Sequence, residues 1–180
     1  EYREMIEDIL KQKQDEQKES LVMDLSFKQP EEFEITKKDD PSDHAALLKM
    51  SIEKVPEFTA GSKVFLAQRL YKIWGRKLPK SENRRLDFYF SFPLEKIDTT
   101  VYILPQGYTV DALPPAKELK TDFTSFSSKS WYDEGQKSVY TSVQIVVKQY
   151  VIPANRYAEV KKFFDDILIT DGQKVVIKKE

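Results

Sequence analysis

Residues Tyr140–Lys178, YTSVQIVVKQYVIPANRYAEVKKFFDDILITDGQKVVIK, decide the fold. Their first part alternates Val143, Ile145 and Val147 with other, mainly polar, residues, which predicts a strand with one buried face. Pro153 ends this strand because it has no backbone N–H to donate. After it, apolar residues recur every three or four positions, the spacing of one stripe of an amphipathic helix: Tyr157, Val160, Phe163, Phe164, Ile167 and Leu168.

The end of this helix is predicted at Asp171-Gly172, with Gly172 in the left-handed conformation that often follows a last helical turn. Val175 and Ile177 then begin a short final strand. A strand, a covering helix and a return strand provide a core on which the rest of the chain can pack.

The N-terminal part is predicted to be helical. Its apolar residues follow helical spacing at Tyr2, Met5, Ile6, Ile9 and Leu10, and the next ten positions hold good helix formers without an apolar stripe. We expect residues 1–28 to form a helical segment or a connector from an upstream domain, and residues 29–180 to form the β-rich domain.

Several short runs of period-two alternation separated by turn residues predict further strands. The clearest contain Leu86–Phe92 and Ile97–Ile103, and a four-residue loop after Tyr132 joins two more as a hairpin. The expected fold class is therefore mainly β, of the β-rich α+β type. We expect an antiparallel β-sandwich with an N-terminal helix and one C-terminal helix packed on a sheet.

Composition limits the function. The 180 residues include 29 Lys and Arg against 30 Asp and Glu, so no global charge attracts nucleic acid or an anionic membrane. Cysteine is absent, which excludes disulfides, thiolate metal sites and a cysteine nucleophile in this sequence. No apolar run approaches the roughly 20 residues that span a bilayer. Because the first residue is Glu1, we expect the chain to come from a longer polypeptide.

The patterns around the candidate catalytic and metal-binding residues favour ordinary solvated side chains over a catalytic or metal-binding role. His44, the single histidine, lies near Asp39, Asp40 and Asp43, but their spacing does not match a calcium loop. Asp165 and Asp166 are adjacent on the predicted helix and diverge by about 100°, so they do not converge on one substrate atom. We expect no catalytic residue, no metal site and no cofactor.

A basic cluster precedes the aromatic run at Phe88–Phe90, and we interpret it as a solvated loop rather than a nucleic-acid site: Arg76, Lys77, Lys80, Arg84 and Arg85. Trp74, Trp131 and Tyr132 are the candidate ligand-binding residues, since exposed aromatics at loop edges can line a face for a glycan or peptide. The alternative is that these rings plug the ends of the sandwich.

Residues Asn83–Leu119, followed by the Tyr140–Lys178 unit, carry a family resemblance. The first contains a segment of the form LP-x-G-Y-x-V-x-x-LP, made by Leu104, Pro105, Gly107, Tyr108, Val110, Leu113 and Pro114. This arrangement resembles the C-terminal β-rich domain of unknown function that follows a transglutaminase-like core in exported multidomain proteins of Gram-negative bacteria.

The resemblance implies an accessory role. In that family the catalytic Cys-His-Asp set belongs to the upstream core, so no catalytic role passes to a residue here. The implied partner is the transglutaminase-like domain of the same polypeptide, and the implied location is the periplasm or the cell surface. A free-standing module that binds a glycan or peptide is the alternative.

Overall fold

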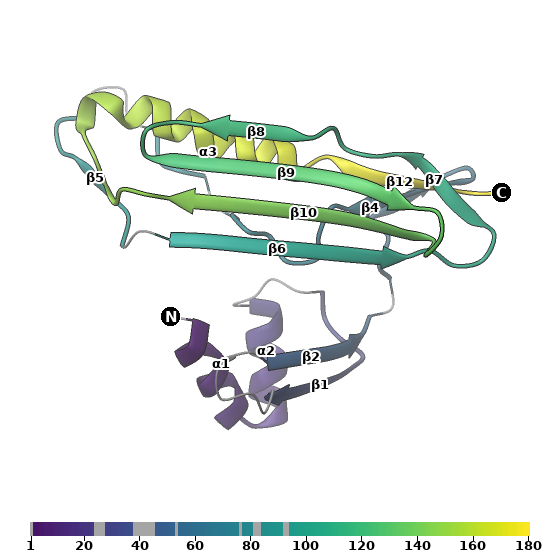
Figure 1. The fold of residues 1–180 in the computed structure, drawn as a ribbon. Coiled ribbons are helices and arrows are strands. Elements are labelled where there is room, and N and C mark those ends of the chain that lie inside the picture. Colours follow the sequence, from purple (N-terminus) through teal and green to yellow (C-terminus); the bar gives the residue numbers. More distant parts are fainter. Residues whose placement is uncertain are drawn as a thin grey trace. The chain divides into compact units, whose positions relative to one another are not determined.

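The computed structural model describes residues 2–23, 28–37, 46–52, 54–75, 77–80, 84–91 and 94–180 (Figure 1). It is mainly β with several antiparallel sheets, which confirms the expected β-rich α+β class. The chain divides into two compact units, residues 1–55 and residues 56–180.

The first unit contains two helices and a two-stranded sheet. Its elements are α1 (Tyr2–Lys11), α2 (Gln14–Met23), β1 (Glu32–Lys37) and β2 (Ala46–Ser51). In the described part of the chain, β1 and β2 pair only with each other, in antiparallel register from Glu32 opposite Ser51 to Lys37 opposite Ala46. The unit boundary therefore lies after this hairpin, whereas the sequence suggested a boundary after residue 28.

The second unit holds the remaining elements: β3 (Phe58–Ala60), β4 (Lys63–Ala67), β5 (Phe88–Tyr89), β6 (Leu94–Ile103), β7 (Tyr108–Ala112), β8 (Lys117–Lys120), β9 (Thr124–Asp133), β10 (Ser138–Val147), β11 (Val151–Ile152), η1 (Ala154–Arg156), α3 (Tyr157–Asp171) and β12 (Lys174–Lys179). Two four-stranded antiparallel sheets dominate it, in the orders β6-β10-β9-β8 and β3-β4-β12-β7. Strands β5 and β11 make a short pair.

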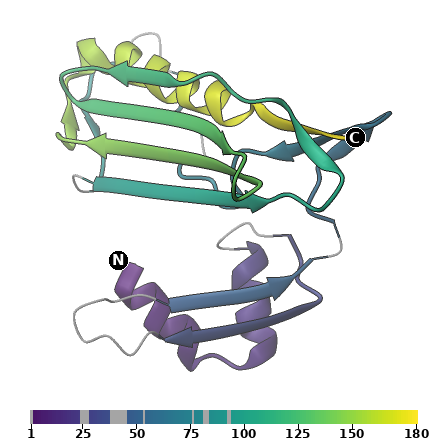
Figure 2. The same ribbon diagram turned by 45° about the vertical axis from the view of Figure 1, so that its right-hand side comes forward.

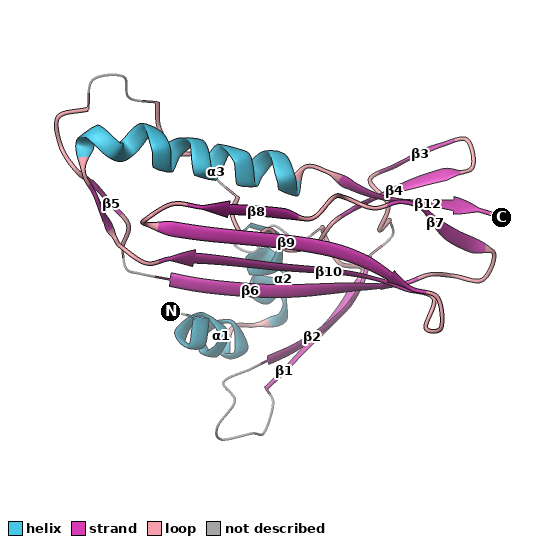
Figure 3. Cartoon of the chain, turned by 45° about the horizontal axis from the view of Figure 1, so that its top comes forward, coloured by secondary structure: helices cyan, strands magenta, loops and turns pink. Residues whose placement is uncertain are grey.

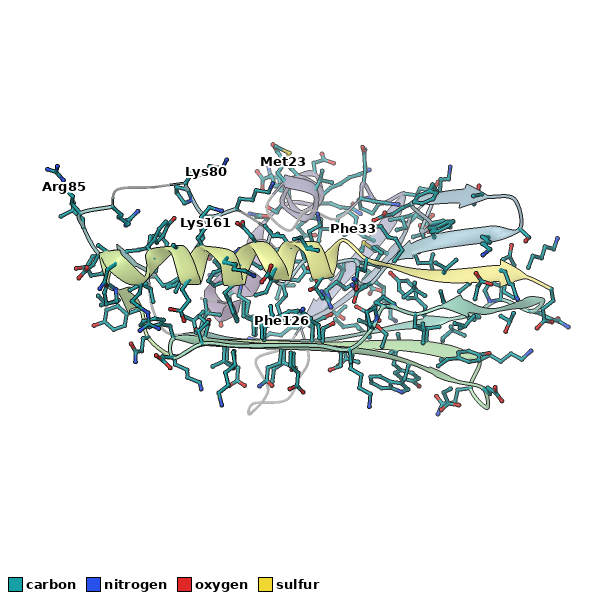
Figure 4. All side chains as sticks on the ribbon, turned by 90° about the horizontal axis from the view of Figure 1, so that it is seen from above. Met23, Phe33, Lys80, Arg85, Phe126 and Lys161 are labelled. Atoms are coloured by element: carbon teal, nitrogen blue, oxygen red, sulfur yellow. The ribbon has the colours of Figure 1, made fainter. Side chains whose placement is uncertain are left out.

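Helix α3 forms where the apolar period predicts it, and its stripe packs on the inner face of the β6-β10-β9-β8 sheet. Figure 4 shows Phe126 between this helix and the sheet. The main core combines the helix stripe with residues of β9 and β10 and with Trp74, Leu78 and Phe90. The expected helix on a sheet is therefore present.

The second sheet covers the other end of the first. Leu66, Val175 and Ile177 from β4 and β12 form a separate core cluster with Val139 of β10 and Leu104 just after β6. After α3 the chain enters β12, which pairs with β4 (Figure 2). The two sheets thus face each other over one end only, and α3 covers the rest, so the sandwich is partial.

Gly172 differs from its prediction. It caps α3 with φ −71° and ψ −17°, a right-handed conformation, and its backbone N–H donates to the carbonyl of Leu168. The next N–H, of Gln173, donates to the carbonyl of Thr170 three residues back, so the helix ends by a tightened turn instead of a left-handed residue. Left-handed glycines occur at Gly61 and Gly107, in the turns before β4 and β7.

Candidate functional site

The outer face of the β6-β10-β9-β8 sheet carries the candidate site. Along β10, Val139, Val143 and Ile145 are buried on the inner side, whereas Tyr140 and Ser142 alternate with them on the outer side. Side chains on this outer face point away from α3 (Figure 4). The antiparallel register aligns the outer residues of neighbouring strands into cross-strand rows.

One row contains an aromatic pair. Tyr140 lies opposite Trp131 of β9 and opposite Val101 of β6. The rings of Trp131 and Tyr140 are stacked, with centroids 5.1 Å apart and planes 6° from parallel. The Tyr140 hydroxyl also hydrogen-bonds Gln136 Oε1 at 2.6 Å, which fixes the ring at the hairpin. Because β10 supports one face of Trp131, its opposite face is turned toward the β8 side of β9.

A groove lies on that side. Strand β8 pairs with β9 only as far as Lys117 opposite Ser128, while β9 continues to Asp133 (Figure 3). The groove has a volume of about 610 Å³, and its lining combines one aromatic ring, one alanine and polar side chains: Ala116, Glu118, Ser127, Ser128, Lys129, Trp131 and Ser142. Lys129 Nζ lies 5.9 Å from the Trp131 ring centroid.

The three predicted ligand-binding aromatics are not brought together. Trp131 is 38% exposed and lines the groove. Tyr132, the next residue along β9, points to the opposite face and packs against the second core cluster. Trp74 is a core residue, with its ring centroid 4.2 Å from that of Phe164, so its assignment to a binding surface was wrong.

Sequence reasoning missed Tyr140, which supports Trp131, and the residues that line the groove beside it. Tyr140 could have been found by counting the register outward from the predicted hairpin loop, which places it opposite Trp131. No sequence pattern predicts that Glu118 and Lys129 line one groove, because this depends on where the pairing of β8 with β9 begins.

A second feature of the outer face is the apolar row on β6. Ile97, Val101 and Ile103 are 67%, 45% and 79% exposed. The alternate residues, among them Asp98 and Tyr102, are half-buried on the inner side. Strand β6 is an edge strand, paired in the described part of the chain with β10 alone. Ile97, Val101 and Ile103 thus share the outward side with Glu95 and Thr99, whereas a half-buried strand usually turns such apolar side chains inward.

The inner side of β6 meets a buried charged cluster. Arg69, just after β4, contacts Asp171 at the end of α3 and lies 3.8 Å from Asp98. Burial lowers the pKa of Arg69, opposed by the nearby Asp98. Burial, assisted by Glu57 and Asp98, raises the pKa of Tyr102 to about 12. Tyr102 donates a hydrogen bond to the Ala67 carbonyl at 3.0 Å. These contacts tie β4, β6 and α3 together.

The other candidate residues have local partners or lie outside the described residues. His44, Asp39, Asp40, Asp43 and Arg76 belong to the latter group. Asp165 contacts Lys161 and Asp166 contacts Lys162, one helical turn apart in each case.

Arg84 lies over the Tyr157 ring, 4.5 Å from its centroid. Within the described residues, no group of three or more acidic or histidine side chains could hold a metal ion. No helix in the described part is long and apolar enough to cross a bilayer.

Comparison with known proteins places the β-rich unit in a family. The model of a domain of unknown function with a solved structure, DUF3858, matches residues 62–177, more than half of the chain. The chain belongs to the DUF3858 family. The match runs from β4 through α3 into β12 and leaves out β3 and the last two residues of β12, so the family domain coincides with most of the second unit.

Comparisons with individual proteins add one structure. A chain from Parabacteroides distasonis, named as a "putative protease", matches 56% of this chain with 10% identity and a TM-score of 0.47. The match covers 19% of that longer chain. No curated protein matches.

Proposed function

We propose that this DUF3858 domain is a non-catalytic accessory domain of a transglutaminase-like protein, which it packs on and positions in the periplasm or at the cell surface. The sequence resemblance of Asn83–Leu119 and Tyr140–Lys178 supports this context. The absence of cysteine from the sequence is consistent with a contact role, because a transglutaminase-like reaction requires a cysteine nucleophile.

The outward apolar row of β6 is the observation that carries the proposal. Ile97, Val101 and Ile103 stand on one side of a ten-residue edge strand, and all three are exposed. Thr99 lies between Ile97 and Val101 on the same side, so the three apolar side chains are grouped but interrupted. Exposed apolar side chains gathered on one face mark interaction surfaces in soluble proteins. A long edge strand with β-branched residues also presents unpaired backbone groups. Both properties favour a polypeptide partner, and the transglutaminase-like core is the partner that the resemblance implies.

The proposal is tested by titrating this chain with the transglutaminase-like domain encoded upstream in the same open reading frame, using isothermal calorimetry. We expect saturable binding that weakens at least about tenfold in an Ile97→Asn and Ile103→Asn double variant, because a polar amide would be buried at each position. The matched control is Ile169→Asn, which changes an equally exposed isoleucine on α3.

Absence of binding, or equal weakening by Ile169→Asn, would contradict the proposal. An activity assay gives a second readout: the purified chain alone is expected to show no transglutaminase or amidase turnover. Turnover that stays constant per mole through repeated purification would show that this chain is catalytic.

The second candidate function is binding of a glycan or peptide, which the groove beside Trp131 favours. This groove lies on β8, β9 and β10 and involves none of the three β6 residues above, so the two roles are compatible.

A further inference from the structure

We propose that the groove beside Trp131 is a binding site for a neutral saccharide, an inference that rests on the second candidate function above. The proposal starts from the shape of the site. The groove runs along the outer face of β9 at the point where β8 stops pairing, and its volume of about 610 Å³ falls in the range of small-ligand sites. The segment leading into β8 contains Pro114 and Pro115, which have no N–H with which to continue the ladder beside β9.

Trp131 provides a preorganised apolar platform. Its ring is stacked on Tyr140, and Tyr140 is held by its hydrogen bond to Gln136. The indole therefore cannot collapse toward β10, and its second face is turned toward the groove. The ammonium of the exposed Lys129 lies over the ring, 5.9 Å from its centroid, so a ligand that packs on this face must displace the Lys129 side chain. A pyranose has one face of C–H groups and a rim of hydroxyls, so it can pack that face on the indole while its hydroxyls remain free to hydrogen-bond.

The polar lining matches such a rim. Ser127 and Ser142 can each donate and accept a hydrogen bond, Glu118 accepts, and Lys129 donates. One acid and one base leave the groove without net charge, which favours a neutral ligand over a polyanion. These are outward side chains of the sheet, which favours a ligand recognised by its hydroxyls over a peptide paired through its backbone.

The test uses calorimetry on the full chain with five probes. Three are neutral hexasaccharides, of glucose, mannose and N-acetylglucosamine; the others are oligogalacturonate and an alanine-rich peptide of similar length. We expect saturable binding of at least one neutral hexasaccharide. Intrinsic tryptophan fluorescence should change with the same midpoint, because Trp131 lines the site while Trp74 is buried.

Two variants locate the site. Trp131→Ala should weaken binding at least about tenfold through loss of the platform. Ser142→Phe should weaken binding similarly, because the phenylalanine fills the groove while the indole stays in place. This second variant still tests the site if Trp131→Ala fails to fold. Tyr89→Ala is the matched control, because Tyr89 is an exposed ring on β5 and does not line the groove. Circular dichroism confirms the fold of each variant.

Three results would overturn the proposal: no neutral hexasaccharide binds, both groove variants bind as well as the wild-type chain, or only the peptide or oligogalacturonate binds. The β6 double variant should bind the saccharide normally. The two proposals are therefore tested separately: the β6 double variant affects binding of the transglutaminase-like domain, and the groove variants affect binding of the saccharide.

Discussion

Arg69 contacts the carboxylate of Asp171 at the C-terminal end of α3, and the two side chains are only 2% and 6% exposed. A guanidinium at this position also faces the negative end of the helix dipole. Removing one member of a buried ion pair leaves the other charge uncompensated. We therefore predict that Arg69→Met lowers the free energy of unfolding by roughly 3–5 kcal/mol, measured by urea denaturation.

The control for this prediction is Lys162→Met, which breaks the Lys162–Asp166 pair on the same helix, whose side chains are 75% and 29% exposed. Surface pairs of this spacing contribute about 0.3–0.5 kcal/mol. Similar losses in the two variants would mean that the buried pair is not a structural link.

Tyr102 should make stability depend on alkaline pH. Its pKa is raised to about 12 by burial and by the nearby carboxylates of Glu57 and Asp98, from an ordinary value of 10.0. Folding thus favours the neutral phenol, so this contribution is complete below pH 10 and is lost as the pH rises from 10 toward 12.

In Tyr102→Phe, the hydrogen bond to the Ala67 carbonyl disappears, at a cost of about 0.5–1.5 kcal/mol near neutral pH. The stability difference between wild type and variant should shrink above pH 10, because only the wild type has this phenol to ionise. Thermal unfolding across this pH range measures it. Tyr89→Phe, in an exposed ring, should follow the wild type; a constant difference for Tyr102→Phe would refute the role given to burial.

The elements that local periodicity could predict are those that bury one side along their whole length. Strand β10 and helix α3 are both of this kind, so the sequence predicts the inner residues of β10 and the stripe from Tyr157 to Ile167. The predicted strand over Leu86–Phe92 survives only as β5, because Leu86 is exposed and Phe90 packs in the core without extending the strand; Phe92 lies outside the described residues.

Periodicity could not show which side of β6 is buried. Its alternation predicts a strand, but the apolar side faces outward because Asp98 and Tyr102 turn inward toward Arg69. That choice depends on a residue almost thirty positions away. Similarly, the Trp131 groove exists because β8 stops pairing before β9 ends, which is a property of strand pairing and not of a local motif.

Two isoleucines on α3 test the packing of the helix on the sheet. Ile167 is completely buried in the main core, whereas Ile169 is 68% exposed. Ile167→Ala should cost about 2–5 kcal/mol of unfolding free energy, since it removes buried methyl groups and leaves a cavity. Ile169→Ala should change stability by no more than about 0.5 kcal/mol. Urea denaturation of both variants measures the difference in unfolding free energy. Equal decreases would show that α3 does not pack on the sheet through this stripe.

Alanine substitutions at Gly172 and Gly107 test whether α3 ends in the observed right-handed conformation or in the left-handed one that the sequence suggests. Gly172 has a right-handed conformation, and a Cβ there would meet the carbonyl oxygens of Leu168 and Ile169 at 3.4 Å, an ordinary contact. Gly172→Ala should therefore be neutral or stabilise by up to about 1 kcal/mol, because alanine restricts the unfolded chain. Gly107 has φ +79°, so Gly107→Ala should cost about 1–2 kcal/mol. If thermal unfolding shows Gly172→Ala to be as costly as Gly107→Ala, the helix ends in the left-handed conformation that the sequence suggested.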